Sequence, residues 1–257
     1  MSACLVLLAL GISTQLFAQK DSRTKVIAHR GAWKNTKLPQ NAISSLNAAI
    51  KMGCFATECD IWMTADSVLV VNHDPEFYDL HIETSTHQQL LEKKHPNGES
   101  IATLDQFLEV IRKQKATRLV LDRKPSKISK ERSVVIAQKS YRAVMAAKAG
   151  NIVGYILFDY DACLALEKLA PKENIAYLLG DKTPQQVHDD GLWGIDYHQI
   201  LFERNPTWIE DAKRLKLTIN VWTVNEQAAI ESFISRQVDY ITTDEPELAL
   251  KLVKAQK

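Results

Sequence analysis

Short apolar runs alternate along the chain with longer stretches in which apolar residues recur every three to four positions. The runs are rich in Val, Ile, Leu and aromatic residues, which is typical of strands. The predicted strands cover residues 25–29, 55–63, 68–72, 118–123, 153–158, 175–179, 192–197, 218–223 and 240–242.

The longer stretches have the period of an amphipathic helix and often begin at Pro, Thr, Asp or Asn. Predicted helices cover residues 41–52, 103–114, 130–148, 161–169, 184–189, 206–216, 225–236 and 246–254. Strands that alternate with helices in this way favour βαβ units and a parallel sheet.

The second and third predicted strands require a different connection. Only residues 64–67 separate them, which is far too short for a parallel crossover. These two strands should therefore form an antiparallel hairpin, with residues 65–67 at its tip. Counting the hairpin as one unit leaves eight β-then-α units, which predicts a single (β/α)8 TIM barrel with a β-hairpin extension after the second strand.

The N-terminus has the pattern of a secretory signal peptide. Residues 3–12 are apolar, too short a run to span a bilayer as a helix; polar residues 13–15 follow, and then Leu16, Phe17 and the small residue Ala18. No Lys or Arg precedes the apolar run. The pattern predicts a signal peptide over residues 1–18, a barrel domain over residues 24–257, a periplasmic or secreted location, and no stable membrane insertion.

Composition narrows the function classes. The chain has 32 Lys and Arg against 31 Asp and Glu, a net charge of +1, and this balance excludes a polybasic nucleic-acid binder. Beyond the signal segment, Cys54, Cys59 and Cys163 are odd in number and lack zinc-site spacing. We expect all three to be buried packing residues.

The active site of a TIM barrel lies at the C-terminal ends of its strands. Glu58 and Asp60 are two positions apart, as are Asp122 and Lys124, so each pair points to one face of its strand. Three carboxylates that converge in the barrel mouth would suit Mg²⁺ or Ca²⁺. The alternative is an ion-pair network between these carboxylates and nearby Lys or Arg.

Two histidines should lie beside this cluster. His29 ends the first strand, and the hairpin return places His73 roughly opposite residues 59 and 60. Imidazoles titrate near neutral pH and serve as general acids and bases. Arg30 and Lys124 add positive charge suited to phosphate oxygens. Together these groups predict a phosphate-ester site.

The motifs that carry these residues resemble the glycerophosphodiester phosphodiesterase family. They run collinearly from Val26 to Pro246 and, in chain order, are V-I-A-H-R-G-A (26–32), P-Q-N (39–41), E-C-D (58–60), V-V-N-H-D-P (70–75), D-R-K (122–124), V-W-T-V-N (221–225) and D-Y-I-T-T-D-E-P (239–246).

The resemblance implies a hydrolase that cleaves a small-molecule glycerophosphodiester to glycerol 3-phosphate and an alcohol. In this family's mechanism the glycerol 2-hydroxyl attacks phosphorus, and water then opens the cyclic phosphate. The site residues that the resemblance implies are the metal ligands Glu58, Asp60 and Asp122, the acid and base His29 and His73, the phosphate-binding Arg30 and Lys124, and the pocket residue Trp222.

Two positions depart from the family pattern. The family usually has Glu after the Pro of P-Q-N, where this chain has Gln40, and its third metal carboxylate is typically Glu rather than Asp122. Gln40 keeps an oxygen ligand without the charge, and Asp122 is one methylene shorter. We expect these changes to affect the metal and the substrate rather than the class of reaction.

Other interpretations remain open at this point. The same site chemistry would serve a phospholipase C-like or sugar-phosphate diesterase, a barrel that binds phosphodiesters without cleaving them, or a metal-dependent isomerase or lyase. His81, His87 and His95 follow the hairpin in a polar segment, which we interpret as a solvated loop or a small insertion over the barrel mouth.

Overall fold

A computed structural model of the protein describes residues 24–255. The signal peptide that the sequence predicts over residues 1–18 lies outside the described residues. Among those described, no helix is both long enough and apolar enough to cross a membrane.

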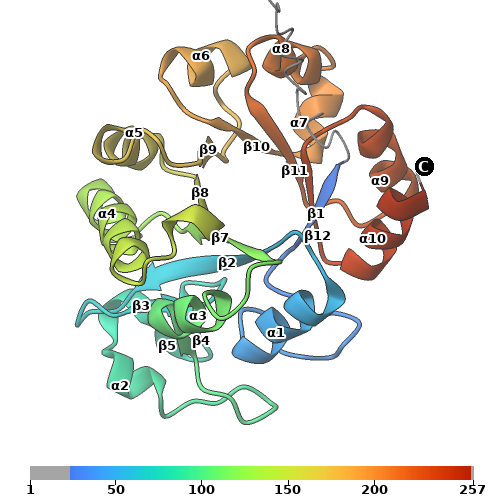
Figure 1. Ribbon diagram of the computed structural model, residues 1–257. Coiled ribbons are helices and arrows are strands. Elements are labelled where there is room, and N and C mark those ends of the chain that lie inside the picture. The colour runs from blue at the N-terminus through green and yellow to red at the C-terminus, as the bar shows by residue number, and fades with distance from the viewer. Residues whose placement is uncertain (1–23, 256–257) are drawn as a thin grey trace, which may run out of the picture.

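Eight parallel strands form a closed barrel (Figure 1). The first strand pairs in parallel with both the second and the last, which closes the sheet. The predicted TIM barrel is therefore confirmed. Its strands are β1 (Lys25–Ala28), β2 (Ala56–Met63), β7 (Arg118–Arg123), β8 (Val153–Leu157), β9 (Ile175–Tyr177), β10 (Gly194–His198), β11 (Thr218–Trp222) and β12 (Tyr240–Thr243).

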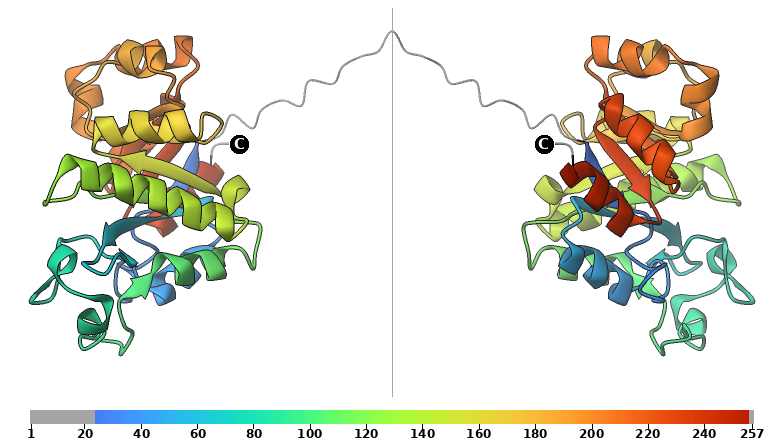
Figure 2. Two further views of the ribbon diagram at one scale, coloured as in Figure 1. Left: turned by 90° about the vertical axis from the view of Figure 1, so that its left-hand side faces the viewer. Right: turned by 90° about the vertical axis from the view of Figure 1, so that its right-hand side faces the viewer.

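Helices surround the barrel on the outside (Figures 1 and 2). Several begin where the sequence places a capping side chain: Thr103, Ser129 and Thr183 each accept a hydrogen bond from a backbone N–H of the first turn. The helices are α1 (Ile43–Met52), α3 (Leu104–Ile111), α4 (Lys130–Ala146), α5 (Tyr160–Leu169), α6 (Pro184–Asp189), α7 (Gln199–Arg204), α8 (Trp208–Arg214), α9 (Gln227–Ser235) and α10 (Pro246–Ala255), with a 3₁₀ turn η2 (Gly150–Ile152) before β8. The sequence did not predict α7, which directly follows β10 and begins after His198 rather than at a Pro, Thr, Asp or Asn.

The second strand turns back on itself as an antiparallel pair. β2 pairs with β3 (Leu69–Val71), and Ile61 lies opposite Val71. β6 (Ala102–Thr103) extends the sheet on the other side of β3. The chain between β3 and β6 forms β4 (Glu76–Phe77), β5 (Leu80–His81), a 3₁₀ turn η1 (Ile82–Thr84) and α2 (His87–Leu90).

This segment is a small insertion rather than a solvated loop. It has its own apolar cluster, separate from the main core, formed by Trp62, Val70, Phe77, Ile82, Leu90 and Ile101. In the side views it extends from one side of the barrel (Figure 2). The apolar residues are too widely spaced in the sequence to show a period, so their clustering depends on the tertiary structure.

A buried ion pair attaches the insertion to the barrel. The side chain of Glu83 is 0% exposed and accepts from Arg132 Nε at 2.9 Å. The same guanidinium donates through Nη2 to the carbonyl oxygens of Met63 and Thr64 at the end of β2. The insertion is thereby fixed beside β2, the strand that carries two of the three predicted metal ligands, Glu58 and Asp60.

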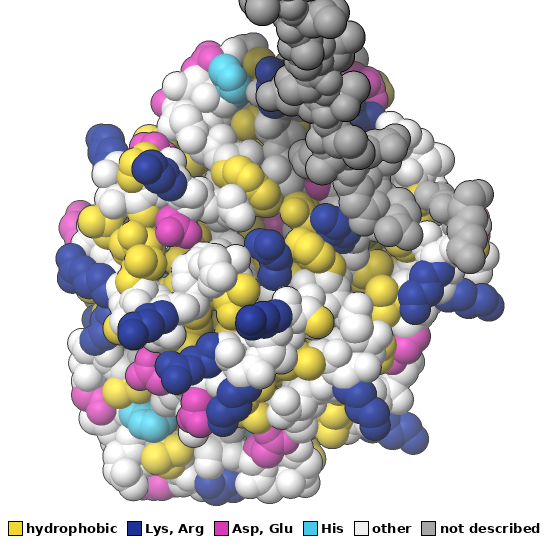
Figure 3. All heavy atoms as spheres, viewed as in Figure 1, with side chains coloured by type: hydrophobic (Ala, Val, Ile, Leu, Met, Phe, Trp, Pro, Cys, Tyr) yellow, Lys and Arg dark blue, Asp and Glu magenta, His cyan; other side chains and the backbone are white. Residues whose placement is uncertain are grey.

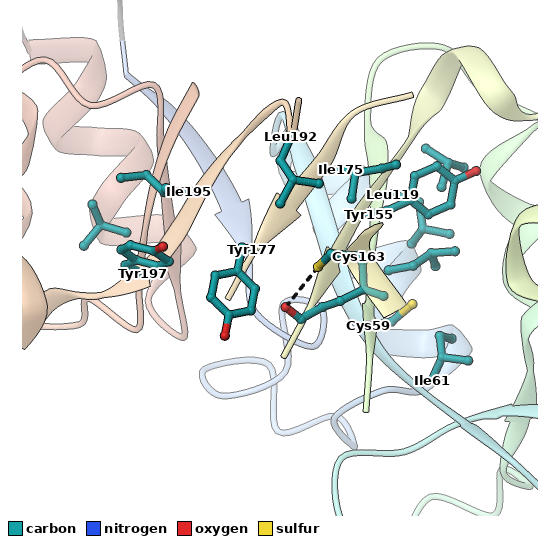
Figure 4. Packing of buried hydrophobic residues seen from close by; sticks show 14 of the residues in the cluster. Cys59, Ile61, Leu119, Tyr155, Cys163, Ile175, Tyr177, Leu192, Ile195 and Tyr197 are labelled. Carbon is teal, nitrogen blue, oxygen red and sulfur yellow. Dashed lines mark hydrogen bonds between the residues drawn. The ribbon is translucent and has the colours of Figure 1, made fainter. Parts of the chain in front are cut away.

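The main core lies between the barrel strands and the surrounding helices. Figure 4 shows Cys59 and Cys163 there, among aliphatic and tyrosine side chains. The thiol of Cys163 donates to the carbonyl oxygen of Leu157 at 3.8 Å. Cys54, like the other two, is buried and forms no disulfide with another cysteine of residues 24–255, so the expectation of packing cysteines is confirmed. On the face shown in Figure 3, Lys and Arg side chains are spread out and interspersed with Asp and Glu.

Candidate active site

Inward-facing residues at the C-terminal ends of the strands line a pocket of about 540 Å³. One side is polar and the other apolar. The polar side is formed by His29, Arg30, Glu58, His73, Asp122 and Lys124; the apolar side by Ile156, Phe158, Leu178 and Trp222; Asp196, Thr223 and Thr242 complete the lining. Seven of the eight predicted site residues line this pocket. The eighth, Asp60, lies directly beside it, in contact with Lys124.

The three predicted carboxylates meet at one point. Asp60 lies directly beside Asp122 in the parallel pairing of β2 and β7, and one oxygen each from Glu58, Asp60 and Asp122 lie within 4.8 Å of one another. None of the three is more than 4% exposed. Alternation along two neighbouring strands therefore produces the cluster, as the spacing predicted.

Two cations of the chain contact this cluster. Lys124 Nζ lies 2.7 Å from Asp60 Oδ1 and 2.6 Å from Asp122 Oδ2, and Arg30 Nε lies 3.5 Å from Asp60 Oδ2. The predicted alternative, an ion-pair network, is thus present as well. The two positive charges of this network offset the negative charges of two carboxylates and leave the charge of Glu58 without a cationic partner in the network.

The protonation of the cluster reflects this imbalance. Burial raises the pKa of Glu58 well above its ordinary value, and the charges of Asp60 and Asp122 add to the effect. Burial also raises the pKa of Asp122 to about 7. Asp60 is buried too, but Lys124 and Arg30 hold its pKa below the ordinary value.

The donor set fits a divalent cation. Glu58 Oε1 and Asp122 Oδ1 are buried and have no hydrogen-bond partner among residues 24–255. Buried carboxylate oxygens normally have a partner or a cation. An all-oxygen set with one uncompensated negative charge is suited to a hard cation such as Mg²⁺ or Ca²⁺. Glu58, Asp60 and Asp122 are therefore able to hold a metal ion.

Two residues of the P-Q-N motif form hydrogen bonds that hold Asp60 and Arg30 in place. Asn41 donates through Nδ2 to Asp60 Oδ2 at 2.7 Å, and its Oδ1 accepts from the backbone N of Asp60 at 3.1 Å. Gln40 Oε1 accepts from Arg30 Nη1 at 2.6 Å. Gln40, which keeps an oxygen ligand without the charge of the family's Glu, thus uses this oxygen to orient Arg30.

The H-R-G motif forms a tight turn after β1. Arg30 and Gly31 both have positive φ, 57° and 86°. A Cβ at Gly31 would lie 2.6–2.7 Å from atoms of Ser45, so only glycine fits there. The turn directs the backbone N–H of Arg30 to Glu58 Oε2 at 2.9 Å and leaves the guanidinium at the pocket.

His29 is held by a hydrogen-bonded relay. Its Nδ1 lies 2.7 Å from Asp244 Oδ1, and Asp244 Oδ2 accepts from Asn225 Nδ2 at 2.8 Å. Burial alone would raise the pKa of Asp244, but the hydrogen bonds from His29 and Asn225 hold it below its ordinary value. Because a carboxylate only accepts, Nδ1 carries the proton and Nε2 is left to exchange protons in the pocket.

His73 has a looser environment. Its Nδ1 lies 2.8 Å from Asp74 Oδ1, and the two side chains are 39% and 72% exposed. Burial, with the charges of Arg30 and Lys124, lowers the pKa of His73, although Asp60 acts in the opposite direction. The two imidazoles therefore differ: one is tightly oriented, and the other is held neutral near pH 7.

We expect Asp244→Asn to lower kcat by roughly 10²-fold at neutral pH. An amide has a single acceptor oxygen, so the donor of either His29 or Asn225 would lose its partner, and the charge that stabilises an imidazolium would be gone. The measurement is a pH–rate profile beside that of Glu245→Gln. Glu245 bonds Lys34 and Asn35 outside the pocket. Equal profiles for the two variants would contradict the relay.

Trp222 belongs to the apolar side of the pocket. Its Nε1 donates to the carbonyl oxygen of Asp196 at 2.9 Å, and its ring packs edge-on against Phe158 and His198. The indole therefore presents a fixed apolar face to the pocket.

A groove of about 930 Å³ adjoins the pocket. Arg30 and His73 line both cavities. The insertion contributes Glu76, Phe77 and Tyr78 to the groove. A phosphate held at Arg30 would thus have one cavity on either side.

Sequence reasoning missed three residues of this site. Asp244 lies in the motif D-Y-I-T-T-D-E-P and Asn225 in V-W-T-V-N. No local sequence pattern pairs Asp244 with His29, however, because the two residues are 215 positions apart. Asp196 carries no motif at all. Its inward direction could have been read from the alternation along β10, but its burial could not.

The chain is similar to several known proteins. The sequence model described as the glycerophosphoryl diester phosphodiesterase family matches residues 29–248. A crystal structure of a glycerophosphodiester phosphodiesterase from Parabacteroides distasonis is 39% identical, with a TM-score of 0.88, over 91% of this chain and 98% of that one. A glycerophosphodiester phosphodiesterase from Caldanaerobacter subterraneus is 27% identical over 90% of this chain and 98% of its own length.

A third similarity concerns the fold alone. A phosphodiesterase from Oleispira antarctica, whose structure contains the product sn-glycerol-3-phosphate, is 20% identical with a TM-score of 0.77, over 90% of this chain and 97% of that one.

Proposed function

This chain belongs to the glycerophosphoryl diester phosphodiesterase family, and we propose that it hydrolyses glycerophosphodiesters to glycerol 3-phosphate and an alcohol by metal-dependent, histidine-mediated catalysis. One observation carries the proposal: a single pocket brings together three buried carboxylates, two imidazoles and two cations. Phosphoryl transfer requires charge neutralisation, positioning and proton transfer, and these groups supply all three.

Glu58, Asp60 and Asp122 would hold the divalent cation. When bound, it supplies positive charge that offsets the charge developing on the phosphate oxygens. Arg30, which lines both the pocket and the groove, and Lys124, which lines the pocket, bind the same oxygens, and Gln40 keeps the Arg30 guanidinium in place.

The two histidines divide the proton transfers. In the first step one imidazole takes the proton of the glycerol 2-hydroxyl as its oxygen bonds to phosphorus, and the other protonates the leaving alcohol. In the second step the roles reverse, because water loses a proton as it opens the cyclic phosphate and the 2-hydroxyl regains one. Asp244 orients His29 throughout, and the neutral form of His73 leaves it ready to accept a proton.

We further propose that the protein is exported. The support is the apolar run over residues 3–12 followed by Ala18, which is typical of a signal peptide. N-terminal sequencing of the protein recovered from the growth medium or the periplasm would test it, since a start at Met1 would contradict cleavage.

The direct test is product analysis with glycerophosphocholine and glycerophosphoethanolamine. We expect glycerol 3-phosphate and the free amino alcohol. Glycerol with phosphocholine would instead indicate phospholipase C-like cleavage at the other ester bond. Folded protein that binds glycerophosphocholine without cleaving it, with Mg²⁺ or Ca²⁺ present, would favour a binding role.

A further inference from the structure

The floor of the pocket carries a buried carboxyl group that the proposed mechanism does not use. Asp196 extends inward from β10 and is 1% exposed. It lines the pocket with Glu58, Ile156 and Thr242, and these four residues come from alternate strands, β2, β8, β10 and β12. That is the pattern of one interior layer of a TIM barrel.

Within the described part of the chain, one of the two carboxyl oxygens of Asp196 has a hydrogen-bond partner. Its Oδ2 accepts from Asn220 Nδ2 at 2.6 Å, and the same amide group also donates to Thr242 Oγ1 at 2.9 Å. Asp196 Oδ1 is buried and has no hydrogen-bond partner within residues 24–255. A buried polar atom on the lining of a cavity is normally matched by water or by a ligand.

Asp196 lies across the barrel from the metal-binding carboxylates. In the closed strand order, three strands separate β10 from β2 on either side. Glu58 and Asp196 therefore face each other over the pocket floor. The apolar side chains of Ile156, Leu178 and Trp222 line the same pocket.

The protonation state of this carboxyl group suits an uncharged ligand. Burial raises the pKa of Asp196 to about 8, with a contribution from Asp122. The group is therefore mostly protonated near pH 7. A neutral carboxyl can both donate to and accept from a hydroxyl without repelling a nearby phosphate.

We propose that Asp196 binds the terminal hydroxyl of the substrate's glycerol moiety and so determines its specificity for glycerol over shorter or deoxygenated arms. The proposal rests on the function proposed above. The glycerol arm occupies the pocket, with its carbon chain against Trp222 and its 2-hydroxyl near the histidines, while the alcohol arm leaves past Arg30 and His73 into the groove.

The test compares two diesters that differ by one oxygen atom. Glycerophosphocholine has the terminal hydroxyl, and 2-hydroxypropyl phosphocholine of matching configuration lacks it but keeps the attacking 2-hydroxyl. We expect wild-type kcat/KM to fall about 10- to 100-fold on removal of the hydroxyl. In Asp196→Ala the two substrates should be hydrolysed with nearly equal kcat/KM. An Asp196→Ala variant that discriminates as the wild type does would overturn the proposal.

Thr242→Val is the matched control. It removes the hydroxyl that Asn220 contacts and disturbs the same hydrogen-bonded network, yet leaves the Asp196 carboxyl in place. Whatever its overall rate, it should retain the wild-type preference for glycerophosphocholine. If the alanine variant does not fold, as judged by circular dichroism, Asp196→Asn replaces it, and the preference should shrink rather than vanish.

A binding measurement distinguishes a failure of this proposal from a failure of the proposed function. Calorimetry with sn-glycerol 3-phosphate and 2-hydroxypropyl phosphate measures the same difference without turnover. A preference for glycerol 3-phosphate of about 10-fold or more, lost in Asp196→Ala, would support the subsite even if no diester were hydrolysed, in which case only the proposed activity fails. Equal affinity of the wild type for the two phosphates would overturn the role of Asp196.

Discussion

Replacing His29 with alanine should lower kcat for glycerophosphocholine by about 10³- to 10⁴-fold and leave the fold intact. The imidazole is held by Asp244 at 2.7 Å, so its Nε2 is oriented before the substrate binds. A positioned general acid or base typically contributes a factor of ~10²–10⁴. The upper part of that range applies here because the relay through Asp244 and Asn225 fixes both the tautomer and the ring.

Steady-state kinetics with thermal melting would check this result. His188→Ala is the matched control, because His188 is exposed on α6 and its imidazole pairs with Asp189 rather than with a residue of the pocket; it should keep the wild-type rate. We expect His73→Ala to be severely impaired as well. Near-wild-type rates in both His29→Ala and His73→Ala would exclude the proposed acid–base pair.

Removal of divalent cations should abolish turnover, a loss of about 10³-fold or more. Without a bound cation, the three buried carboxylates are paired with two cationic side chains, Arg30 and Lys124, so the charge that develops on the phosphate oxygens would lack the compensation that the metal supplies. Activity should return when one ion, Mg²⁺ or Ca²⁺, is added to the chelated protein. Chelator-resistant turnover by protein shown to be metal-free would contradict the carboxylate site.

A stability measurement tests the same site without turnover. A cation at 100 times its Kd stabilises the folded state by about 2.7 kcal/mol, which should raise Tm by roughly 5–10 °C for a domain of this size. Asp122→Ala should lose most of this shift. Glu76→Gln should keep it, because Glu76 lines the groove and not the carboxylate cluster. A shift that survives in Asp122→Ala would move the metal site elsewhere.

Metal binding should also weaken as the pH falls. The pKa of Asp122 is raised to about 7 by burial, and that of Glu58 is raised as well. Below those values protons compete with the cation for the same oxygens, so the affinity for Mg²⁺ or Ca²⁺ should decline as the pH drops below about 7. Titrations at pH 6 and pH 8 would measure the change.

The sequence by itself determined the barrel and the core of its site, because both depend on local periodicity. Alternation along a strand has a period of two, which placed Glu58 with Asp60 and Asp122 with Lys124 on the inner face. The short connection over residues 64–67 required a turn rather than a crossover, and His73 followed from the register of that turn.

Only the tertiary structure decided how these groups are supported and charged. Four features join segments that are distant in sequence or carry no periodic signal. They are the pairing of His29 with Asp244, the contact of Gln40 with Arg30, the separate core of the insertion, and the position of Asp196 opposite Glu58. The pKa of each carboxyl depends in turn on burial and on distances between charges. Those quantities exist only once the chain has closed into a barrel, because desolvation and Coulomb energy are properties of positions in space and not of spacing along the chain.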